Sequence, residues 1–375
     1  MADAEAAIRD LNESGTTHAS LEGLARFLLR AESVGSSRLE GLTPAARRIA
    51  EAELSLAITG RADDTVAVEV IGNIAAMESA VSLAARSQRF GLDDLLSVHR
   101  TLMANSPTPE MAGSIRSVQN WIGGSSYNPC RASFVPPPPE RLPGLLDDLL
   151  DYLNGDRHSP LTQAALVHAQ FETLHPFADG NGRTGRALIH VVLRRRGLTP
   201  RFVPPISLVL ATWATDYVEG LTTFRHLSPP DSTERSTAAA SWLRVFATAT
   251  SRACAEARRY SRLVADVTDG WRADLGRVRA NSSVDLLLQV LPGAPIVTVE
   301  SAQAMTGRSK ARTAEAVNTL ATAGVLRQRN IGRQRSRVFE ATRILDLFTG
   351  LERALATETG DTAAEPLVRP APARP

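Results

Sequence analysis

A twelve-residue run constrains the possible fold of this chain most. Residues 175–186 read His-Pro-Phe-Ala-Asp-Gly-Asn-Gly-Arg-Thr-Gly-Arg, and they join two expected helices. Apolar side chains recur at helical spacing over residues 160–174, so we expect a helix with one buried face there. Pro176 disfavours helical geometry at His175 and should end this helix. A second helix is expected over about residues 184–196. The sequence therefore predicts a helix–loop–helix whose glycines lie at the start of the second helix.

This run gathers the groups that a nucleotidyl transfer needs. The N–H groups and the dipole at a helix N-terminus favour phosphate, and glycines let that backbone approach an anion closely. His175 is a candidate general base, because the ordinary pKa of histidine lies near neutral. Asp179 suits Mg²⁺ that also binds phosphate oxygens, although a helix cap is the alternative role for it. Arg183 and Arg186 lie one turn apart at a helix end that disfavours cations, so we expect them to hold phosphate oxygens rather than to be plain surface charges.

Two other motifs overlap this run, and each lacks a part that its site needs. Gly180 to Gly185 satisfies G-x-G-x-x-G, but a dinucleotide site needs a preceding strand and an acidic residue about 20 residues later. Here a helix is expected before the glycines, and no Asp or Glu occurs between Asp179 and Asp216. Glu172-Thr-Leu-His175 has the spacing of a di-iron ligand pair, yet the sequence lacks the second copy that such a site needs.

Residues 175–186 resemble the signature of the Fic family, His-x-Phe-x-(Asp/Glu)-Gly-Asn-(Gly/Lys)-Arg-x-x-Arg, and match it at every fixed position. Residues 113–139 are similar to the family's flap region, which includes Trp121, Ile122 and Gly123. The Gly-Gly pair that begins at Gly123 suits the tip of a hairpin. The resemblance covers roughly residues 20–240.

The resemblance implies a protein adenylyltransferase, which moves AMP from Mg²⁺-bound ATP to a Ser, Thr or Tyr hydroxyl of a target protein and releases pyrophosphate. His175 would take the proton of that hydroxyl, Asp179 would hold Mg²⁺, and the target would dock along the flap as an added strand. Tyr217 matches a tyrosine that the family uses beside the adenine, whereas its usual tyrosine neighbour is Val218 here. The resemblance assigns the nucleotide to Gly180, Asn181, Gly182, Arg183, Thr184, Gly185, Arg186 and Tyr217.

An N-terminal segment, Ser36-Ser-Arg-Leu-Glu40-Gly41, fits the family's inhibitory motif, (Ser/Thr)-x-x-x-Glu-(Gly/Asn). Residues four apart share one face of a helix, so Ser36 and Glu40 should point toward the same neighbour. The resemblance implies that this neighbour is Arg186 and that the pair keeps the resting chain at low activity. Two alternatives stay open: the core removes AMP, since some relatives use this glutamate for hydrolysis, or it transfers another nucleotide.

Residues 281–350 are expected to form a separate unit. Two helices, at 299–305 and 309–323, precede two segments that can pair as a hairpin, and this order resembles a winged helix-turn-helix domain. Between residues 301 and 340 there are eight Lys or Arg against two Glu, and phosphate contact is the commonest use of such a bias. Double-stranded DNA is therefore an expected partner, and the chain would then be a transcriptional regulator with a Fic core. The alternative is a winged helix reused for dimerisation, which makes a homodimer the other candidate assembly.

The rest of the chain is expected to be mainly α-helical. The composition is that of an ordinary globular protein (43% hydrophobic, 22% charged), and no apolar run approaches about 18 residues, so we expect no membrane span. An acidic start and only two cysteines favour the cytoplasm. We expect N-terminal helices with the inhibitory motif (1–60, with 1–20 loosely held), a Fic core with a β-hairpin flap (61–240), a helical connector (241–280), the winged helix (281–350) and a disordered tail (351–375).

Overall fold

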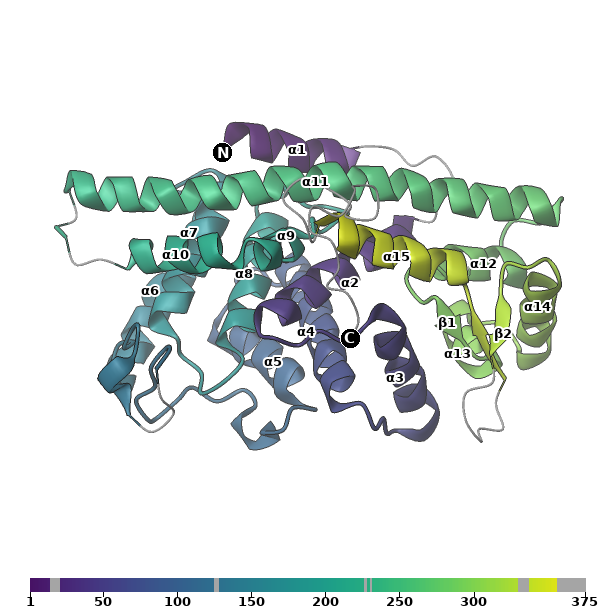
Figure 1. Ribbon diagram of the computed structural model, residues 1–375, viewed down its shortest axis with the longest axis horizontal. Coiled ribbons are helices and arrows are strands. Elements are labelled where there is room, and N and C mark those ends of the chain that lie inside the picture. The colour runs from purple at the N-terminus through teal and green to yellow at the C-terminus, as the bar shows by residue number, and fades with distance from the viewer. Residues whose placement is uncertain (14–20, 125–127, 226–227, 230, 330–336, 356–375) are drawn as a thin grey trace, which may run out of the picture. The chain divides into compact units, whose positions relative to one another are not determined.

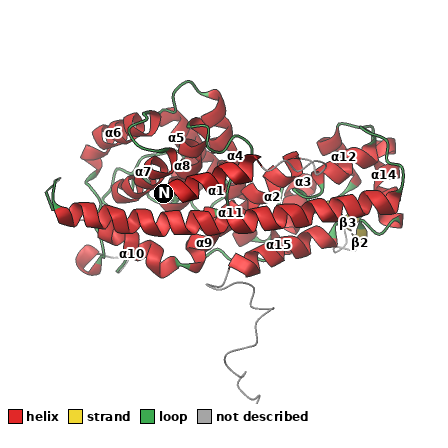
Figure 2. Ribbon diagram, turned by 90° about the horizontal axis from the view of Figure 1, so that it is seen from above, coloured by secondary structure: helices red, strands yellow, loops and turns green. Residues whose placement is uncertain are grey.

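The computed structural model describes residues 1–13, 21–124, 128–225, 228–229, 231–329 and 337–355. The chain divides into two compact units, which we describe separately. The first unit comprises Met1–Gly15 and Leu28–Cys254, and the second comprises Thr16–Phe27 and Ala255–Pro375. Both units consist largely of helices, which are drawn in red in Figure 2.

The first unit is a helical bundle (Figure 1). It contains α2 (Leu21–Leu39) from Leu28 onward and α11 (Thr233–Leu275) up to Cys254. Its other helices are α1 (Ala2–Glu13), α3 (Ala46–Thr59), α4 (Thr65–Arg86), α5 (Leu92–Met103), α6 (Leu142–Asn154), α7 (Pro160–Leu174), α8 (Asn181–Arg195), α9 (Ile206–Thr212) and α10 (Ala214–Phe224). Short 3₁₀ turns lie between α5 and α6, at Pro109–Met111, Pro129–Arg131 and Pro139–Arg141.

The core of the first unit forms around α7 and α8, which pack against each other, while α8 also packs against α4. Small side chains allow this close approach: Ala164, Ala165 and Ala169 of α7 are fully buried. Trp242 of α11 is also fully buried and donates its indole N–H to the carbonyl of Ala165 at 2.9 Å. The helix–loop–helix that carries residues 175–186 is therefore fixed by the packing of several helices.

Helix α4 is long and apolar enough, by length and composition, to cross a membrane: an 18-residue window has a mean hydropathy of 1.5. Half of that window is buried, and Val70, Ile74 and Met77 belong to the core of the first unit. α4 also contacts α3, α5 and α8. The sequence has no uninterrupted apolar run of this length, yet α4 as a whole is apolar. Its contacts are those of a core helix.

The second unit contains the later part of α11 and a small domain with a three-stranded sheet. Its elements are α12 (Ser283–Val290), β1 (Ile296–Val297), α13 (Val299–Thr306), α14 (Lys310–Thr322), β2 (Arg327–Arg329), β3 (Val338–Glu340) and α15 (Thr342–Leu355). The antiparallel sheet has the order β1-β3-β2, with Ile296 opposite Glu340 and Gln328 opposite Phe339. Gly307 ends α13 in the left-handed region (φ 64°), and α14 follows directly.

The ends of the chain differ from the expectations. Residues 2–13 were expected to be loosely held, but they form α1, because Ala4, Ile8 and Leu11 make one apolar face that is buried. Residues 351–355 of the expected tail belong to α15, and residues 356–375 lie outside the described residues.

Three internal elements also differ. α8 begins at Asn181, three residues before the expected start at Thr184, because Gly180 (φ 73°) leads directly into the helix. The sequence also predicts one helix over residues 207–221, after Pro204 and Pro205, but the structure divides it into α9 and α10 at Trp213, whose backbone is not helical (φ −98°, ψ 42°). β1 was not expected, because a two-residue strand leaves almost no pattern in a sequence.

Candidate active site

His175 lies one residue beyond the end of α7, in the left-handed region (φ 47°, ψ 59°). Its N–H still bonds to the carbonyl of Phe171 at 2.9 Å, and Pro176 prevents a further helical turn. The His175 carbonyl accepts a hydrogen bond from Arg116 Nε at 2.9 Å. The His175 side chain is 20% exposed. The imidazole is therefore partly open to an incoming group, while its backbone is held on both sides.

The loop after His175 is fixed by a buried aromatic stack. Phe177 is fully buried, and its ring lies parallel to the ring of His99 on α5, with the centroids 3.7 Å apart. His99 Nδ1 accepts the N–H of Gly113 (2.9 Å), so the ring proton is on Nε2, which donates to the carbonyl of Asp179 (3.0 Å). Burial lowers the pKa of His99 to about 4, which keeps the ring neutral. From the sequence alone His99 is expected to be a core or helix-packing residue, and the structure shows that it also supports the loop at Asp179.

Asn181 shapes the same loop with its side chain. Its Oδ1 accepts the N–H of Phe177 and its Nδ2 donates to the carbonyl of Phe177, both at 2.8 Å. The residue is 3% exposed. The sequence placed Asn181 among the nucleotide-binding residues, but its amide is occupied by the loop, so only its backbone N–H is left for a phosphate.

The first turn of α8 faces Glu40, which follows α2. A Cβ added to Gly182 would collide with Glu40 Oε1 and would lie 2.8 Å from Arg186 Nη1, so the absence of a side chain at Gly182 leaves room for this carboxylate. Arg186 Nη2 donates to Glu40 Oε1 at 2.7 Å. The carboxylate therefore occupies a position beside a helix N-terminus that suits an anion, here called the anion position.

Arg186 is buried (1% exposed), and each of its nitrogens has a partner. Nε donates to Ser36 Oγ at 2.9 Å, and Nη2 also donates to the Ser36 carbonyl at 2.8 Å, so Ser36 and Glu40 contact the same arginine, as their spacing predicts. Burial disfavours the charge of Arg186, but Tyr217, Glu40 and Glu172 outweigh this effect and raise its pKa. Burial likewise acts to raise the pKa of Glu40, and the charge and hydrogen bond of Arg186 lower it overall. The Glu40–Arg186 pair is therefore ionised near neutral pH.

Tyr217, on α10, supports Arg186 from a third element. Its hydroxyl lies 2.9 Å from His168 Nε2 and accepts from Arg186 Nη1 at 3.4 Å. The ring packs between His168 and Trp242, with centroid distances of 5.9 and 6.0 Å, and the residue is 5% exposed. The sequence did not reveal this internal contact, and a place for Tyr217 beside the adenine stays a prediction.

Arg183 and Asp179 form the other half of the loop site. Arg183 is 3% exposed, and its ion pairs with Glu69 (3.7 Å) and Asp179 (3.8 Å) are too long to be hydrogen bonds. Among the described residues, Arg183 Nε and Nη1 have no hydrogen-bond partner. The Asp179 side chain is 54% exposed, and in the described part of the chain no three His, Cys, Asp or Glu side chains gather as a metal site. One open carboxylate suits Mg²⁺ that arrives with phosphate oxygens.

The missing side chain of Gly185 faces α7 and not the anion position, and a place for Gly185 beside the nucleotide stays a prediction. A Cβ at this position would lie 2.8 Å from Glu172 Oε1 and 2.9 Å from Phe171 Cδ1. Thr184 is 1% exposed and its N–H bonds to the Gly180 carbonyl as part of the helix. Gly185 therefore allows α8 to pack closely on α7.

The flap, residues 113–139, contains a minimal hairpin. Ile122 forms an isolated antiparallel bridge with Phe134, and Gly123 follows in the left-handed region (φ 76°), as expected for the tip; residues 125–127 lie outside the described residues. Trp121 and Ile122 are partly buried, and Gly123 is exposed. Next to the flap, a cavity of 440 Å³ is lined by Glu110, Met111, residues 114–120 and Ala178.

Helix α2 is held in the first unit by buried polar contacts. Glu32 is fully buried and accepts from the N–H of Ser207 (2.7 Å), while its other carboxylate oxygen lies 2.8 Å from His190 Nε2. Asn73 of α4 donates to the Ser33 carbonyl at 2.8 Å. Beyond the helix, Gly41 adopts φ 80°, and a Cβ there would meet no atom within 4 Å. The helix is thus firmly packed up to Ser37, whereas the chain at Glu40 and Gly41 is exposed.

Comparison with known protein families matches residues 89–193 to the Fic/DOC family. The chain is similar to protein adenylyltransferase fic-1 of Caenorhabditis elegans, with 34% identity over 141 residues that cover 36% of this chain and 26% of that protein. It is also similar to protein adenylyltransferase Fic of Drosophila willistoni, with 32% identity over 155 residues that cover 40% of this chain and 29% of that protein. The matched part thus spans between a quarter and a third of the length of these relatives.

Two solved structures share the fold. A Fic family protein from Desulfovibrio desulfuricans G20 superposes with a TM-score of 0.52 and 20% identity, covering 91% of this chain and 95% of that chain. A Fic domain containing signaling protein from Bacteroides thetaiotaomicron gives a TM-score of 0.52 and 20% identity, covering 68% of this chain and 94% of that chain. The family match, the signature at residues 175–186 and this likeness together show that the chain contains a Fic domain with the mainly helical Fic fold.

Proposed function

We propose that this chain is a protein adenylyltransferase that uses ATP. The oxygen of a target Ser, Thr or Tyr hydroxyl attacks the α-phosphorus, the bond from that phosphorus to the oxygen bridging the β-phosphate breaks, and pyrophosphate leaves. His175 takes the proton of the attacking hydroxyl. The observation that carries this proposal is a partly exposed His175 that follows α7 on the same short loop as the N-terminus of α8, where Arg183 and Arg186 are buried. The names of the similar curated proteins support the same reaction.

The nucleotide phosphates are proposed to bind at the first turn of α8. Phosphate oxygens would supply the acceptors that Arg183 Nε and Nη1 lack among the described residues. Asp179 is the proposed ligand of Mg²⁺, because its carboxylate is open and the loop beneath it is fixed by His99. When bound, the ion would neutralise charge on the phosphates and on the leaving pyrophosphate.

Glu40 is proposed to inhibit the enzyme from within the same chain. Its carboxylate holds Arg186 at 2.7 Å and takes the space beside Gly182, so it competes with a phosphate group for both. ATP would then bind with its α-phosphorus misplaced, and small misplacements at a reacting centre are costly. Movement of Glu40 away from Arg186 would restore the arginine to the nucleotide.

The target protein is proposed to dock along the flap. The bridge between Ile122 and Phe134 supplies a short edge to which an extended target segment can add as a strand. The adjoining 440 Å³ cavity is bordered by Met111 and by Val118, which is 73% exposed, and can receive an apolar target side chain. Arg116 links the flap to the His175 carbonyl, so a docked segment would lie close to the base.

Mass spectrometry after incubation with ATP and Mg²⁺ tests the reaction, because self-modification adds AMP to a peptide of the chain. In a Glu40→Gly background, His175→Ala should reduce transfer at least ~10²-fold and leave ATP binding close to that of the parent. His158→Ala is the matched control, since His158 is exposed and bonds to Tyr152 outside the motif. Equal transfer from α-labelled ATP with and without His175 would remove this residue from the reaction.

Two related reactions of the same core need separate assays. Removal of AMP is supported by Glu40, whose ionised carboxylate is 39% exposed and could activate a water molecule. It predicts that AMP-modified chain loses AMP in the absence of ATP, and that Glu40→Gln stops the loss. Transfer of another nucleotide predicts that GTP, CTP or UTP labels the chain faster than ATP does.

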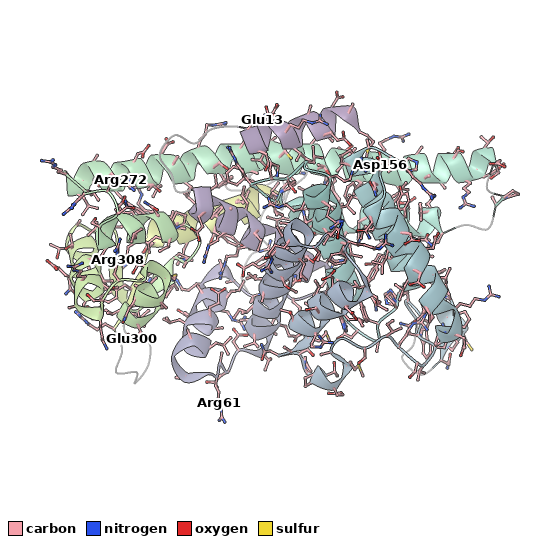
Figure 3. All side chains as sticks on the ribbon, turned by 180° about the vertical axis from the view of Figure 1, so that it is seen from behind. Glu13, Arg61, Asp156, Arg272, Glu300 and Arg308 are labelled. Atoms are coloured by element: carbon pink, nitrogen blue, oxygen red, sulfur yellow. The ribbon has the colours of Figure 1, made fainter. Side chains whose placement is uncertain are left out.

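We also propose that the second unit binds double-stranded DNA. Its order of helix, strand, helix, helix, strand and strand, with the sheet order β1-β3-β2, supports a winged helix-turn-helix. α14, in the place of a recognition helix, exposes Arg312, Asn318 and Thr319. A cavity of 640 Å³ in this unit is lined by Arg279, Arg308 and Arg312 together with residues of α14; Arg308 is labelled in Figure 3.

Fluorescence anisotropy of the full chain with mixed duplex DNA tests this second proposal. Affinity should fall steeply between 50 and 200 mM salt, and Arg312→Ala should reduce the salt slope by about 1 if that arginine contacts one phosphate. Arg353→Ala, on the exposed face of α15, is the control. A chain shortened after residue 280 should lose DNA binding and keep adenylylation. Absent or salt-insensitive binding, with a concentration-dependent dimer in sedimentation, would favour the dimerisation alternative.

A further inference from the structure

A buried acid lies directly behind His175. Glu172 precedes it by one turn of α7, and Glu172 Oε2 lies 3.8 Å from His175 Nδ1. Glu172 is 6% exposed. Within the described part of the chain, neither Glu172 Oε1 nor His175 Nδ1 has a hydrogen-bond partner. Buried polar atoms are normally paired, so two neighbouring groups with unpaired atoms call for a functional explanation.

Gly185 keeps the space beside this carboxylate free of a side chain. A Cβ at this position would lie 2.8 Å from Glu172 Oε1 and 3.2 Å from His168 Nδ1. The carboxyl group can therefore turn about its side-chain torsions toward His175. A separation of 3.8 Å needs only a small rotation to become a hydrogen bond, and such bonds at catalytic sites are often long before substrate binds.

We propose that Glu172 is a positioning residue that selects the tautomer of His175. As a carboxylate it accepts the proton on Nδ1, which leaves the Nε2 lone pair free to take the proton of a target hydroxyl. As a carboxylic acid it donates to Nδ1, and the single ring proton then resides on Nε2, where it blocks the base. The inactive form holds one additional proton, taken from solvent and carried by Glu172. This inference rests on the proposed role of His175 as the base.

The surroundings decide whether Glu172 or His175 takes the additional proton. Burial, with a smaller contribution from Glu40, raises the pKa of Glu172 to about 7, while Arg186 and Arg225 act in the opposite direction. Burial and Arg225 lower the pKa of His175 to about 4. As the pH falls through about 7, the proton therefore goes to Glu172 and His175 stays uncharged. The titratable and charged groups that face Glu172 are His168 and His175 of α7, Arg186 of α8, Tyr217 of α10, Arg225 and Glu40.

The backbone carbonyl of Glu172 also lies near the His175 ring and is the competing acceptor for a ring proton. Arg225 Nη2 already donates to this carbonyl at 3.1 Å, which leaves the carboxylate as the less occupied acceptor. If the backbone carbonyl of Glu172 were the acceptor for the His175 ring in place of the carboxylate, the tautomer of His175 would not depend on pH near 7. It would also not depend on the side chain at position 172.

Nitrogen NMR of the full chain with ¹⁵N-labelled histidine measures the tautomer without requiring any transfer, and His175→Ala assigns the signal. In the wild-type chain we expect the Nδ1–H form at pH 8 and the Nε2–H form at pH 6, with a midpoint near 7. Glu172→Gln and Glu172→Leu should each abolish this transition, and Glu69→Gln, beside Arg183, should keep it. A transition that persists in both Glu172 variants, or an Nδ1–H form at every pH in the wild type, would overturn the proposal.

Adenylylation rates provide the second measurement. A group with a pKa of about 7 is about tenfold less ionised at pH 6 than at pH 8, so the wild-type transfer rate should fall about tenfold over this range. Glu172→Gln should remove this dependence, and Glu172→Leu should lower kcat at pH 8 about tenfold with little change in the KM for ATP. A wild-type chain with no transfer at any pH but with the expected NMR transition would reject the proposed reaction and retain the tautomer control. Equal pH profiles in the wild type and Glu172→Gln would reject the tautomer control.

Discussion

Replacement of Glu40 by glycine should convert a slow enzyme into a faster one. Glu40 Oε1 accepts a hydrogen bond from Arg186 Nη2 at 2.7 Å, and its carboxylate takes the space beside Gly182. While this pair is intact, a bound ATP cannot place a phosphate group against Arg186. The variant removes the competitor and leaves the other contacts of Arg186, to Ser36 and Tyr217, in place.

The size of the effect follows from the exposure of the pair. A hydrogen bond between charged groups contributes about 1.5–3 kcal/mol when it is shielded from water. The Glu40 side chain is 39% exposed while Arg186 is almost fully buried, so we reduce this value for solvent screening to about 1.4 kcal/mol. At saturating ATP this difference corresponds to a roughly tenfold faster transfer of AMP.

The assay is the initial rate of self-labelling from α-labelled ATP by the full chain. The matched control is Glu53→Ala, which breaks an ion pair between Arg30 of α2 and Glu53 at 2.7 Å and leaves the motif untouched. Glu53→Ala should unfold at lower temperature without any gain in rate. Arg186→Ala should be inactive even when combined with Glu40→Gly. If Glu40→Gly labels no faster than the wild type at saturating ATP, the inhibitory role of Glu40 is wrong.

Three further substitutions, with Gly197→Ala as a control, test the loop and the helix that it precedes. Asp179→Ala should abolish transfer together with its dependence on Mg²⁺, measured as the rate against Mg²⁺ concentration; an unchanged Mg²⁺ profile would exclude Asp179 as the ligand. Gly185→Ala should destabilise the fold by about 1–3 kcal/mol in urea unfolding, because the new methyl group meets Glu172 and Phe171. Gly197→Ala, which meets no atom within 4 Å but keeps φ 70°, should cost only about 1 kcal/mol, and equal losses would contradict the packing argument. Asn181→Ala leaves the buried N–H of Phe177 unpaired and removes one of two hydrogen bonds to its carbonyl, which Asn120 still contacts, so stability should fall by about 1–3 kcal/mol, seen as a lower melting temperature; an unchanged melting temperature would contradict the contacts described.

The sequence was informative where the physical cause is local. Pro176 ends α7 because it constrains the residue before it, whereas the start of α8 at Asn181 came three residues before the expected one. The spacing of Ser36 and Glu40 also predicted a shared neighbour, which is Arg186.

Contacts between distant segments could not be predicted in this way. His99 supports Asp179 across 80 residues, and Tyr217 supports Arg186 across 31, so no local pattern marks either residue. The roles of the motif glycines could not be predicted either, because a glycine can make room for a bound group or for a neighbouring helix. Gly182 admits Glu40, whereas Gly185 admits α7, and only the direction of each missing side chain separates the two roles.

The firm anchoring of α2 has a consequence for the speed of the proposed inhibition. Glu32, Ser33 and Ser36 are fully buried. A Cβ on Gly35 would collide with the backbone of Leu208, so α2 packs closely at this point. Movement of the whole helix out of the first unit would therefore disrupt a large part of the core. The chain after Leu39, at Glu40 and Gly41, is exposed. Relief of inhibition is then a fraying of the helix end, which belongs to the nanosecond to microsecond range of terminal motions. Such an equilibrium is much faster than enzymatic turnover, so the inhibited and the active forms would interconvert many times in each turnover, and a progress curve should show no lag.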